Sequence, residues 1–207
     1  MPTSLTNART YLRARMGLHA SDQLAQDTEI TYYLNEALAA VSSEADWWWL
    51  EEQTSFSTVA GTATYSLPAD HKTTKFLWIG DKPLVPKQYQ EIVRFTNDTA
   101  TVPSFYAITD SLVRLSPTPS AVKTVYHYYI KQETPLSSGS DTPLLPTRYD
   151  GLWLSCAATM LAERMDNPQK VALHERAYER WLRRARDEAR AHRGLVSIRA
   201  RTDTDWG

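Results

Sequence analysis

Residues 30–67 read ITYYLNEALAAVSSEADWWWLEEQTSFSTVAGTATYSL, and the chain changes character within them. Up to Ala45, apolar residues recur every three or four positions, which is the spacing of an amphipathic helix. After Trp47–Trp49, threonine, serine, valine and aromatic residues dominate on both sides of a glycine. This pattern is typical of a β-hairpin formed by Gln53–Ala60 and Thr62–Leu67. The stretch therefore predicts a helix that leads into a strand-rich region at three consecutive tryptophans.

The same two signals, helical spacing of apolar residues and strand-like composition, locate the other elements. Upstream, residues 4–16 keep helical spacing and stop before Gly17, and Asp27 or Thr28 is expected to cap the helix of residues 30–45. Downstream, prolines and serines separate short strand candidates, and two helical patterns follow. We expect strands at residues 75–79, 105–109, 112–115 and 123–131, a short helix at 88–96, and helices over 147–165 and 169–192, the last ended by Gly194.

This order of elements predicts an α+β fold, in which helices from both ends of the chain form one bundle around an inserted antiparallel β-lobe. The expected discontinuous bundle comprises residues 1–50 and 147–194, and the β-rich lobe residues 51–132. Residues 133–146, ETPLSSGSDTPLLP, form a loop by composition, and residues 195–207 are expected to be a tail that orders against a partner. The 207 residues, 42% hydrophobic and 23% charged, suffice for a buried core.

The sequence offers little material for catalysis. It contains no phosphate-binding loop, nucleophile elbow or metal-binding helix motif, and its five histidines lie far apart. The single Cys156 excludes an intramolecular disulfide and falls on the apolar face of a helix, so we expect it in the core. His127 is expected to be a surface or partly packed side chain. We predict no enzyme activity, no catalytic residues, no metal site and no cofactor.

No apolar run is long enough for a membrane span, and the first residues lack the pattern of a signal peptide, so we expect a protein made in a cytosol, without a membrane partner.

Charge is unevenly distributed along the chain. Residues 174–201 contain nine arginines and four acidic residues, although the net charge of the whole chain is −1. This helix is either a solvated face with internal ion pairs or a docking site for something acidic. Because the acids would repel phosphates, an acidic protein partner is favoured, and nucleic-acid binding through an unbroken arginine face remains the alternative.

The three tryptophans cannot all face one way on a helix, because successive side chains point about 100° apart. We expect two of them to pack and the third to be exposed or interfacial, since tryptophan is frequent at association hot spots. The candidate residues for a subunit or tail interface are Trp47, Trp48, Trp49, Leu136 and Leu144.

Five short motifs occur in a fixed order along residues 28–165. They are YSLP at 65–68, PSFY at 103–106, LSPTP at 115–119, the tyrosine pair at 128–129 and LPTRY at 145–149. In this order the chain resembles the head-to-tail adaptor, or connector, proteins of tailed phages, of the tail tubular protein A type.

The resemblance implies a structural virion protein in the neck, made in the host cytoplasm. Such a protein docks as an oligomeric ring of twelve copies on the portal protein and joins it to tail or head-completion proteins. Its helices would face the portal and its β-lobe the tail, and DNA would meet it only as the passing genome. A C-terminal extension commonly grips the portal in this family. The candidate portal-binding residues are Arg183, Arg186, Arg190, Arg193, Leu195, Val196, Ile198, Arg199, Arg201 and Trp206.

Overall fold

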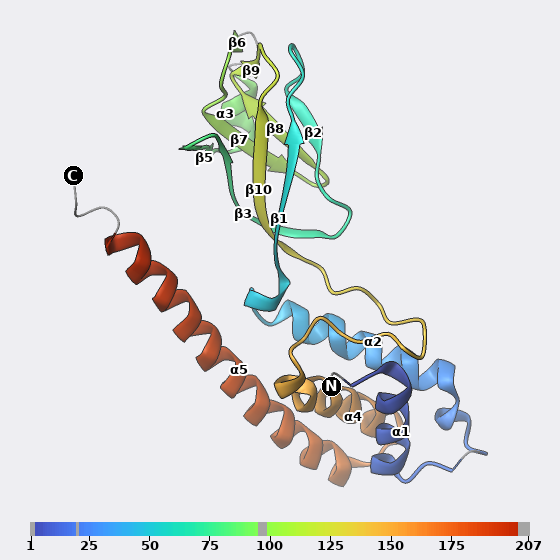
Figure 1. Cartoon of the computed structure of the whole chain (residues 1–207). Coiled ribbons are helices and arrows are strands. Elements are labelled where there is room, and N and C mark those ends of the chain that lie inside the picture. The colour runs from blue at the N-terminus through green and yellow to red at the C-terminus, as the bar shows by residue number, and fades with distance from the viewer. Residues whose placement is uncertain (1–2, 20, 95–98, 203–207) are drawn as a thin grey trace. The chain divides into compact units, whose positions relative to one another are not determined.

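The computed structural model in Figure 1 describes residues 3–19, 21–94 and 99–202, with side chains described up to His192. The chain divides into two compact units. We call residues 1–50 with 133–207 the helical unit, and residues 51–132 the β-lobe. The architecture is the predicted α+β class, with mostly antiparallel sheets in the lobe and helices from both ends of the chain in the other unit.

The helical unit contains α1 (Leu5–Met16), α2 (Asp27–Ser43), α4 (Asp150–Arg164) and α5 (Pro168–Thr202), with 3-10 turns at Gln23–Ala25, Trp48–Leu50 and Thr147–Tyr149. The helix α1 begins after Ser4, whose hydroxyl accepts the Asn7 N–H, and ends at Gly17 with φ of +64°. Most positions of the predicted apolar stripes of α1, α2 and α4 are buried, whereas the predicted stripe of α5 is buried only in part. Trp153 of α4 also donates its indole N–H to the Leu34 carbonyl of α2 at 2.9 Å, so the two helices are joined by a hydrogen bond within the core.

The start of α2 differs from the prediction. The N-cap position is Gln26, without a capping side-chain hydrogen bond, and Asp27 is the first helical residue. The Asp27 carboxylate instead pairs with Arg13 and Arg9 of α1. The hydrogen bond from Arg13, aided by the charge of Arg9, lowers the pKa of Asp27. The carboxylate therefore holds α1 against α2 rather than capping a helix.

The β-lobe contains two four-stranded sheets and one short helix. The first sheet has the order β1 (Glu51–Ser57), β10 (Thr124–Lys131), β3 (His71–Ile79), β4 (Lys82–Pro83). The second has the order β2 (Thr64–Ser66), β8 (Leu112–Ser116), β7 (Phe105–Thr109), β5 (Val85–Pro86), and α3 (Tyr89–Val93) follows β5. Two further short strands, β6 (Thr99–Ala100) and β9 (Thr118–Pro119), pair in parallel. The two sheets share one core, to which Leu77, Ile79 and Val125 come from the first sheet and Tyr106, Val113 and Leu115 from the second.

The predicted hairpin is wrong, because its two arms belong to different sheets. β1 pairs with β10 along its whole length, whereas β2 pairs with β8. The chain crosses between the sheets at Thr58, which is fully buried and whose hydroxyl binds the backbone of Ala121 and Lys123, both at 2.8 Å. Gly61, with φ of +80°, therefore lies in a connection between sheets.

The predicted end of the last helix is also wrong. α5 continues through Gly194 to Thr202, so residues 195–202 are helical rather than part of a tail. One glycine inside a helix costs about 1 kcal/mol relative to alanine, which weakens a helix without ending it. Residues 203–207, with the candidate Trp206, lie outside the described residues.

Candidate interaction surfaces

The three tryptophans form an aromatic cluster inside the helical unit. Trp47 is fully buried, stacks on Trp49 with 4.6 Å between ring centroids, and donates its indole N–H to the Val41 carbonyl at 2.7 Å. Trp48 lies 5.9 Å from the aromatic ring of Tyr149. Trp47 is therefore a core residue, which corrects its assignment to an interface, whereas Trp48 and Trp49 keep partly exposed surface.

This cluster reaches α5. The His192 ring stacks on Trp48 at 5.9 Å, and the Arg148 guanidinium lies 5.8 Å from the Trp48 ring. The Tyr149 hydroxyl and Arg148 both donate to the Glu188 carboxylate of α5, and these hydrogen bonds lower the pKa of Glu188. The cluster thereby fixes the segment of α5 that carries the candidate arginines.

The arginine-rich part of α5 has one buried side and one charged side. Leu182, Ala185 and Ala189 are buried, while Arg183, Arg186 and Arg190 are exposed. Arg186 forms an ion pair with Glu44, which follows α2. The side chains of the candidates Arg193, Leu195, Val196, Ile198, Arg199 and Arg201 lie outside the described part of the chain, although their backbone is helical.

Acidic residues interrupt this arginine side. Asp187 lies 3.5 Å from Arg190, and Asp187 and Glu179 line the same shallow depression as Arg183, Arg186 and Arg190. Within the described side chains the arginines therefore do not make the unbroken face that a nucleic-acid backbone requires. A mixed face of this kind suits a protein partner that carries both signs of charge.

The loop of residues 133–146 is held in place inside the helical unit. Asn35 of α2 clamps Leu136, donating to its carbonyl at 3.0 Å and accepting its N–H at 2.8 Å. The N–H groups of Leu5 and Thr6 donate to carbonyls of the loop. Leu136 is only 5% exposed, so its assignment to an interface is wrong, whereas Leu144 is 41% exposed and stays a candidate.

Two titratable side chains of the core, Cys156 and His127, are held in their uncharged forms by burial. Burial raises the pKa of the Cys156 thiol to about 12, which keeps it protonated and unreactive, as expected of a core residue. His127 is fully buried, which corrects the expectation of a surface or partly packed side chain. Its Nε2 lies 2.9 Å from the Thr74 hydroxyl, which also contacts His71 at 2.8 Å. Burial and the nearby His71 lower the pKa of His127 to about 4, so the side chain is neutral near pH 7.

No group of three His, Cys, Asp or Glu side chains that could hold a metal ion occurs in the described residues.

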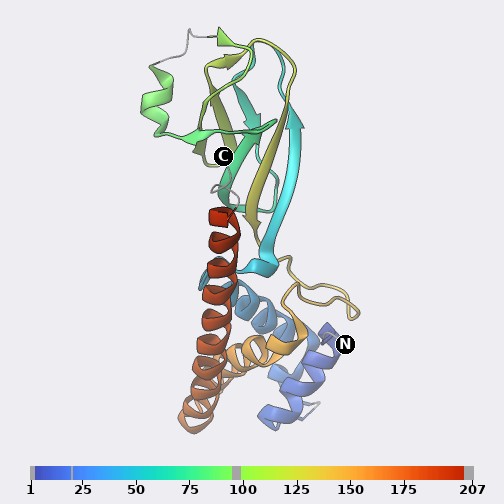
Figure 2. The same ribbon diagram turned by 60° about the vertical axis from the view of Figure 1, so that its left-hand side comes forward.

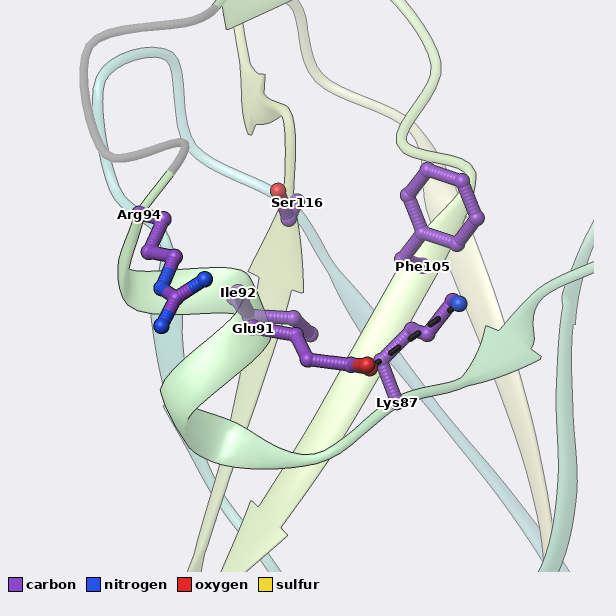
Figure 3. A pocket seen from close by; sticks show the side chains of 6 residues that line it. All are labelled: Lys87, Glu91, Ile92, Arg94, Phe105 and Ser116. Atoms are coloured by element: carbon purple, nitrogen blue, oxygen red, sulfur yellow. Dashed lines mark ion pairs between the residues drawn. The ribbon is translucent and has the colours of Figure 1, made fainter.

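A surface cavity of about 380 Å³ opens beside α3 (Figure 3). Ile92 and Phe105 make its apolar part, and Lys87, Glu91 and Arg94 its charged part. Lys87 pairs with Glu91 at 3.9 Å, and its ammonium lies 5.8 Å from the Phe105 ring. The cavity can receive an apolar or aromatic side chain beside cationic groups.

Sequence reasoning missed one surface of the β-lobe. Phe76 and Trp78 of β3 lie beside Tyr126 and Tyr128 of β10 and form what we call the aromatic face. Each strand carries its two aromatic residues at alternate positions, which was a readable signal in the sequence. The pairing of the two strands, which brings the four side chains together, was not readable.

The model of the SU10 adaptor protein family matches residues 4–201, which include the whole β-lobe and all of the helical unit's helices except the last residue of α5. The chain belongs to the SU10 adaptor protein family. This membership confirms the resemblance to head-to-tail adaptors that the five ordered motifs indicated. No curated protein matches the sequence.

Among solved structures, a chain in the neck of an empty GTA particle is similar to this adaptor-family protein. The two are 15% identical, and the similarity covers 72% of this chain and 74% of that chain. The TM-score is 0.26, so the superposition is too weak to establish a shared fold.

Within the described residues, no helix is both long enough and apolar enough to cross a membrane.

Proposed function

We propose that this protein is a head-to-tail adaptor in the neck of a tailed-phage particle, where copies of it form an oligomeric ring on the portal and connect the portal to tail components. The observation that carries the proposal is the match of the SU10 adaptor family along residues 4–201. The ring of twelve copies and the portal as partner are part of the proposal. It assigns no catalysis to the chain and no cofactor, since an adaptor works by buried contact area alone.

The proposed portal-binding element is the C-terminal half of α5, from Arg183 onward. Its described arginines, Arg183, Arg184, Arg186 and Arg190, are exposed, and the opposite side of the helix is anchored by Leu182, Ala185 and Ala189. The aromatic cluster holds the same segment through His192. A preformed helix loses less conformational entropy on docking than a tail that must first order, so this geometry favours binding.

The test mixes the purified chain with the portal protein encoded beside it in its genome and measures the mass of the complex by native mass spectrometry. We expect a stoichiometric complex. The double variant Arg183→Glu and Arg190→Glu should bind the portal about tenfold more weakly or worse, because charge reversal at an interface places like charges together. The matched control is Arg176→Glu with Arg180→Glu, two exposed arginines nearer the start of the same helix. Equal loss in both variants would contradict the assignment to the C-terminal half.

Deletion of residues 195–207 tests the far end of this element. The deletion leaves Leu182, Ala185 and Ala189 in place, so the packing of α5 should survive and circular dichroism should show a folded protein. Binding to the portal should weaken. Unchanged portal affinity would show that residues 195–207 take no part in docking. Failure of the full chain to bind the portal at all would refute the proposed function itself.

A further inference from the structure

The aromatic face consists of four neighbouring aromatic side chains on one surface of the first sheet. Tyr126 stacks on Trp78 with 5.2 Å between ring centroids, and Phe76 lies 5.0 Å from Tyr128 and 5.2 Å from Trp78. The four aromatic rings thus form one continuous strip across β3 and β10. Gln53 and Ser55 of β1 extend the same surface, since they pair with Tyr128 and Tyr126.

This strip lies on the side of the first sheet that points away from the core. Leu77, Ile79 and Val125, at the alternate positions of the same strands, are buried in the core shared with the second sheet. Phe76 is 46% exposed, and Trp78, Tyr126 and Tyr128 are partly exposed. A sheet that needed only a solvated outer face would carry polar residues here.

A second apolar surface lies on the opposite side of the lobe. α3 packs on the outer side of the second sheet, where Ile92 and Phe105 line the cavity of Figure 3. Val85 and Tyr89 are 48% and 43% exposed on the segment that leads into and begins this helix. In Figure 2 the green helix α3 lies on the far side of the lobe from the cyan strand β1. We call this surface, residues 85–94 with Phe105, the α3 side.

We propose that the aromatic face of one copy of this chain packs against the α3 side of a second copy, so that the β-lobe supplies both halves of the contact between neighbouring copies. This inference rests on the proposed oligomeric ring. A closed ring requires two different, complementary surfaces on each subunit. The lobe has two such surfaces on opposite sides, and a small ligand bound to the strip would account for only one of them.

The two surfaces are also complementary in charge. The α3 side presents Arg94 and the ion pair of Lys87 with Glu91, so one positive charge is left over, whereas the aromatic face presents π-electron surfaces and Glu51, which accepts the hydroxyl hydrogen of Tyr128. Cations are attracted to the faces of tryptophan and tyrosine rings. Phe76 and the three partly exposed rings supply at most about 300 Å² of contact area, roughly a third of what one partner contributes to a standard interface, and Gln53 and Ser55 enlarge the same surface.

The test is cross-linking of portal-bound complexes with a short bis-maleimide. Ser55→Cys places a thiol on the aromatic face and Tyr89→Cys places one on the α3 side, and both native residues are exposed. The only native thiol, Cys156, is buried and stays protonated, so it does not react. The control pairs Tyr89→Cys with Val122→Cys, a residue that is 68% exposed and lies outside both surfaces.

A chain that carries Ser55→Cys and Tyr89→Cys together should give a ladder of products up to the closed ring, and a mixture of the two single variants should give dimers only. Neither single variant should cross-link by itself. The inference is overturned if Ser55→Cys alone gives dimers, which would mean a symmetric contact, or if the two-site chain gives no more product than the control. In both cases portal-bound complexes would still form, so the proposed function would stand. Absence of portal binding by the native chain would overturn both.

A second variant measures the strength of the contact. Trp78→Thr with Tyr126→Thr removes two aromatic rings from the strip while keeping residues that favour strands. We expect assembly about thirtyfold weaker, the loss typical of one hot-spot side chain. Tyr32→Ala, which removes an exposed tyrosine from α2, is the control and should assemble normally. Normal assembly of a folded Trp78→Thr, Tyr126→Thr variant would refute the inference.

Discussion

Gly151 of α4 lies directly against the indole ring of Trp181 of α5, so a side chain added at this position should change the stability. A Cβ atom built on Gly151 would lie 2.5 Å from Cε2 and Nε1 of Trp181. Ordinary carbon contacts are about 3.5–4.0 Å, so Gly151→Ala must push the indole aside by about 1 Å. Overpacking of this kind costs about 1–3 kcal/mol, whereas alanine gains about 0.8 kcal/mol as a helix former. We expect a net loss of about 1 kcal/mol in the unfolding free energy of the helical unit.

The assay is urea unfolding followed by far-ultraviolet circular dichroism in a double-mutant cycle. In a Trp181→Leu background the obstacle is gone, so Gly151→Ala should stabilise the unit by about 0.5–1 kcal/mol through helix propensity alone. The sign of the effect therefore reverses between the two backgrounds. If Gly151→Ala stabilises the protein in both, the close contact between α4 and α5 does not exist and the reasoning fails.

Three further predictions concern single side chains. The pKa of His127 is about 4 in the folded protein and 6.5 in the unfolded chain, so protonation favours unfolding. The free energy of unfolding should be at its full value above pH 6.5 and should fall by about 3 kcal/mol as the pH is lowered to 4. Unfolding experiments across this range should lose the trend in His127→Asn. Asn35→Ala removes both hydrogen bonds to Leu136, which should cost about 2 kcal/mol and hasten proteolysis of residues 133–146. Trp48→Ala should lower the unfolding free energy by about 2 kcal/mol, because Trp48 contacts Tyr149 and His192, and unchanged thermal stability would contradict this packing.

The helices were predictable from the sequence because their hydrogen bonds are local. The apolar period and Gly17 fixed α1 almost to the residue, and the same period located α2 and α4. Helix ends were less predictable where tertiary contacts compete. Asp27 suits an N-cap by residue type, but the arginines of α1 bind its carboxylate. Gly194 is a residue type that often ends a helix, yet α5 continues through it. Gly17 ends α1 because it adopts the left-handed conformation, and the sequence does not show which glycine will do so.

The positions of the longer strands were also readable from the sequence, but the short strands β4, β5, β6 and β9 and the strand partners were not. The partner of β1 is β10, about 70 residues later, and such pairing depends on the whole lobe. For the same reason the histidine pair could not be foreseen. His71 and His127 meet only because β3 lies beside β10 in the first sheet, where Thr74 hydrogen-bonds to both.

The candidate interfaces illustrate why residue type alone misassigns a surface. Trp47 and Leu136 are apolar residues beside turns, which suits an interface, yet each is fixed in the core by a hydrogen bond to or from its neighbours. A buried side chain with satisfied backbone partners has no surface left to offer. Phe76 and Trp78, in contrast, alternate with core residues on a paired strand, and this alternation forces them outward however apolar they are. Exposure imposed by register, rather than apolar character itself, is therefore what distinguishes a docking surface in this protein from its core.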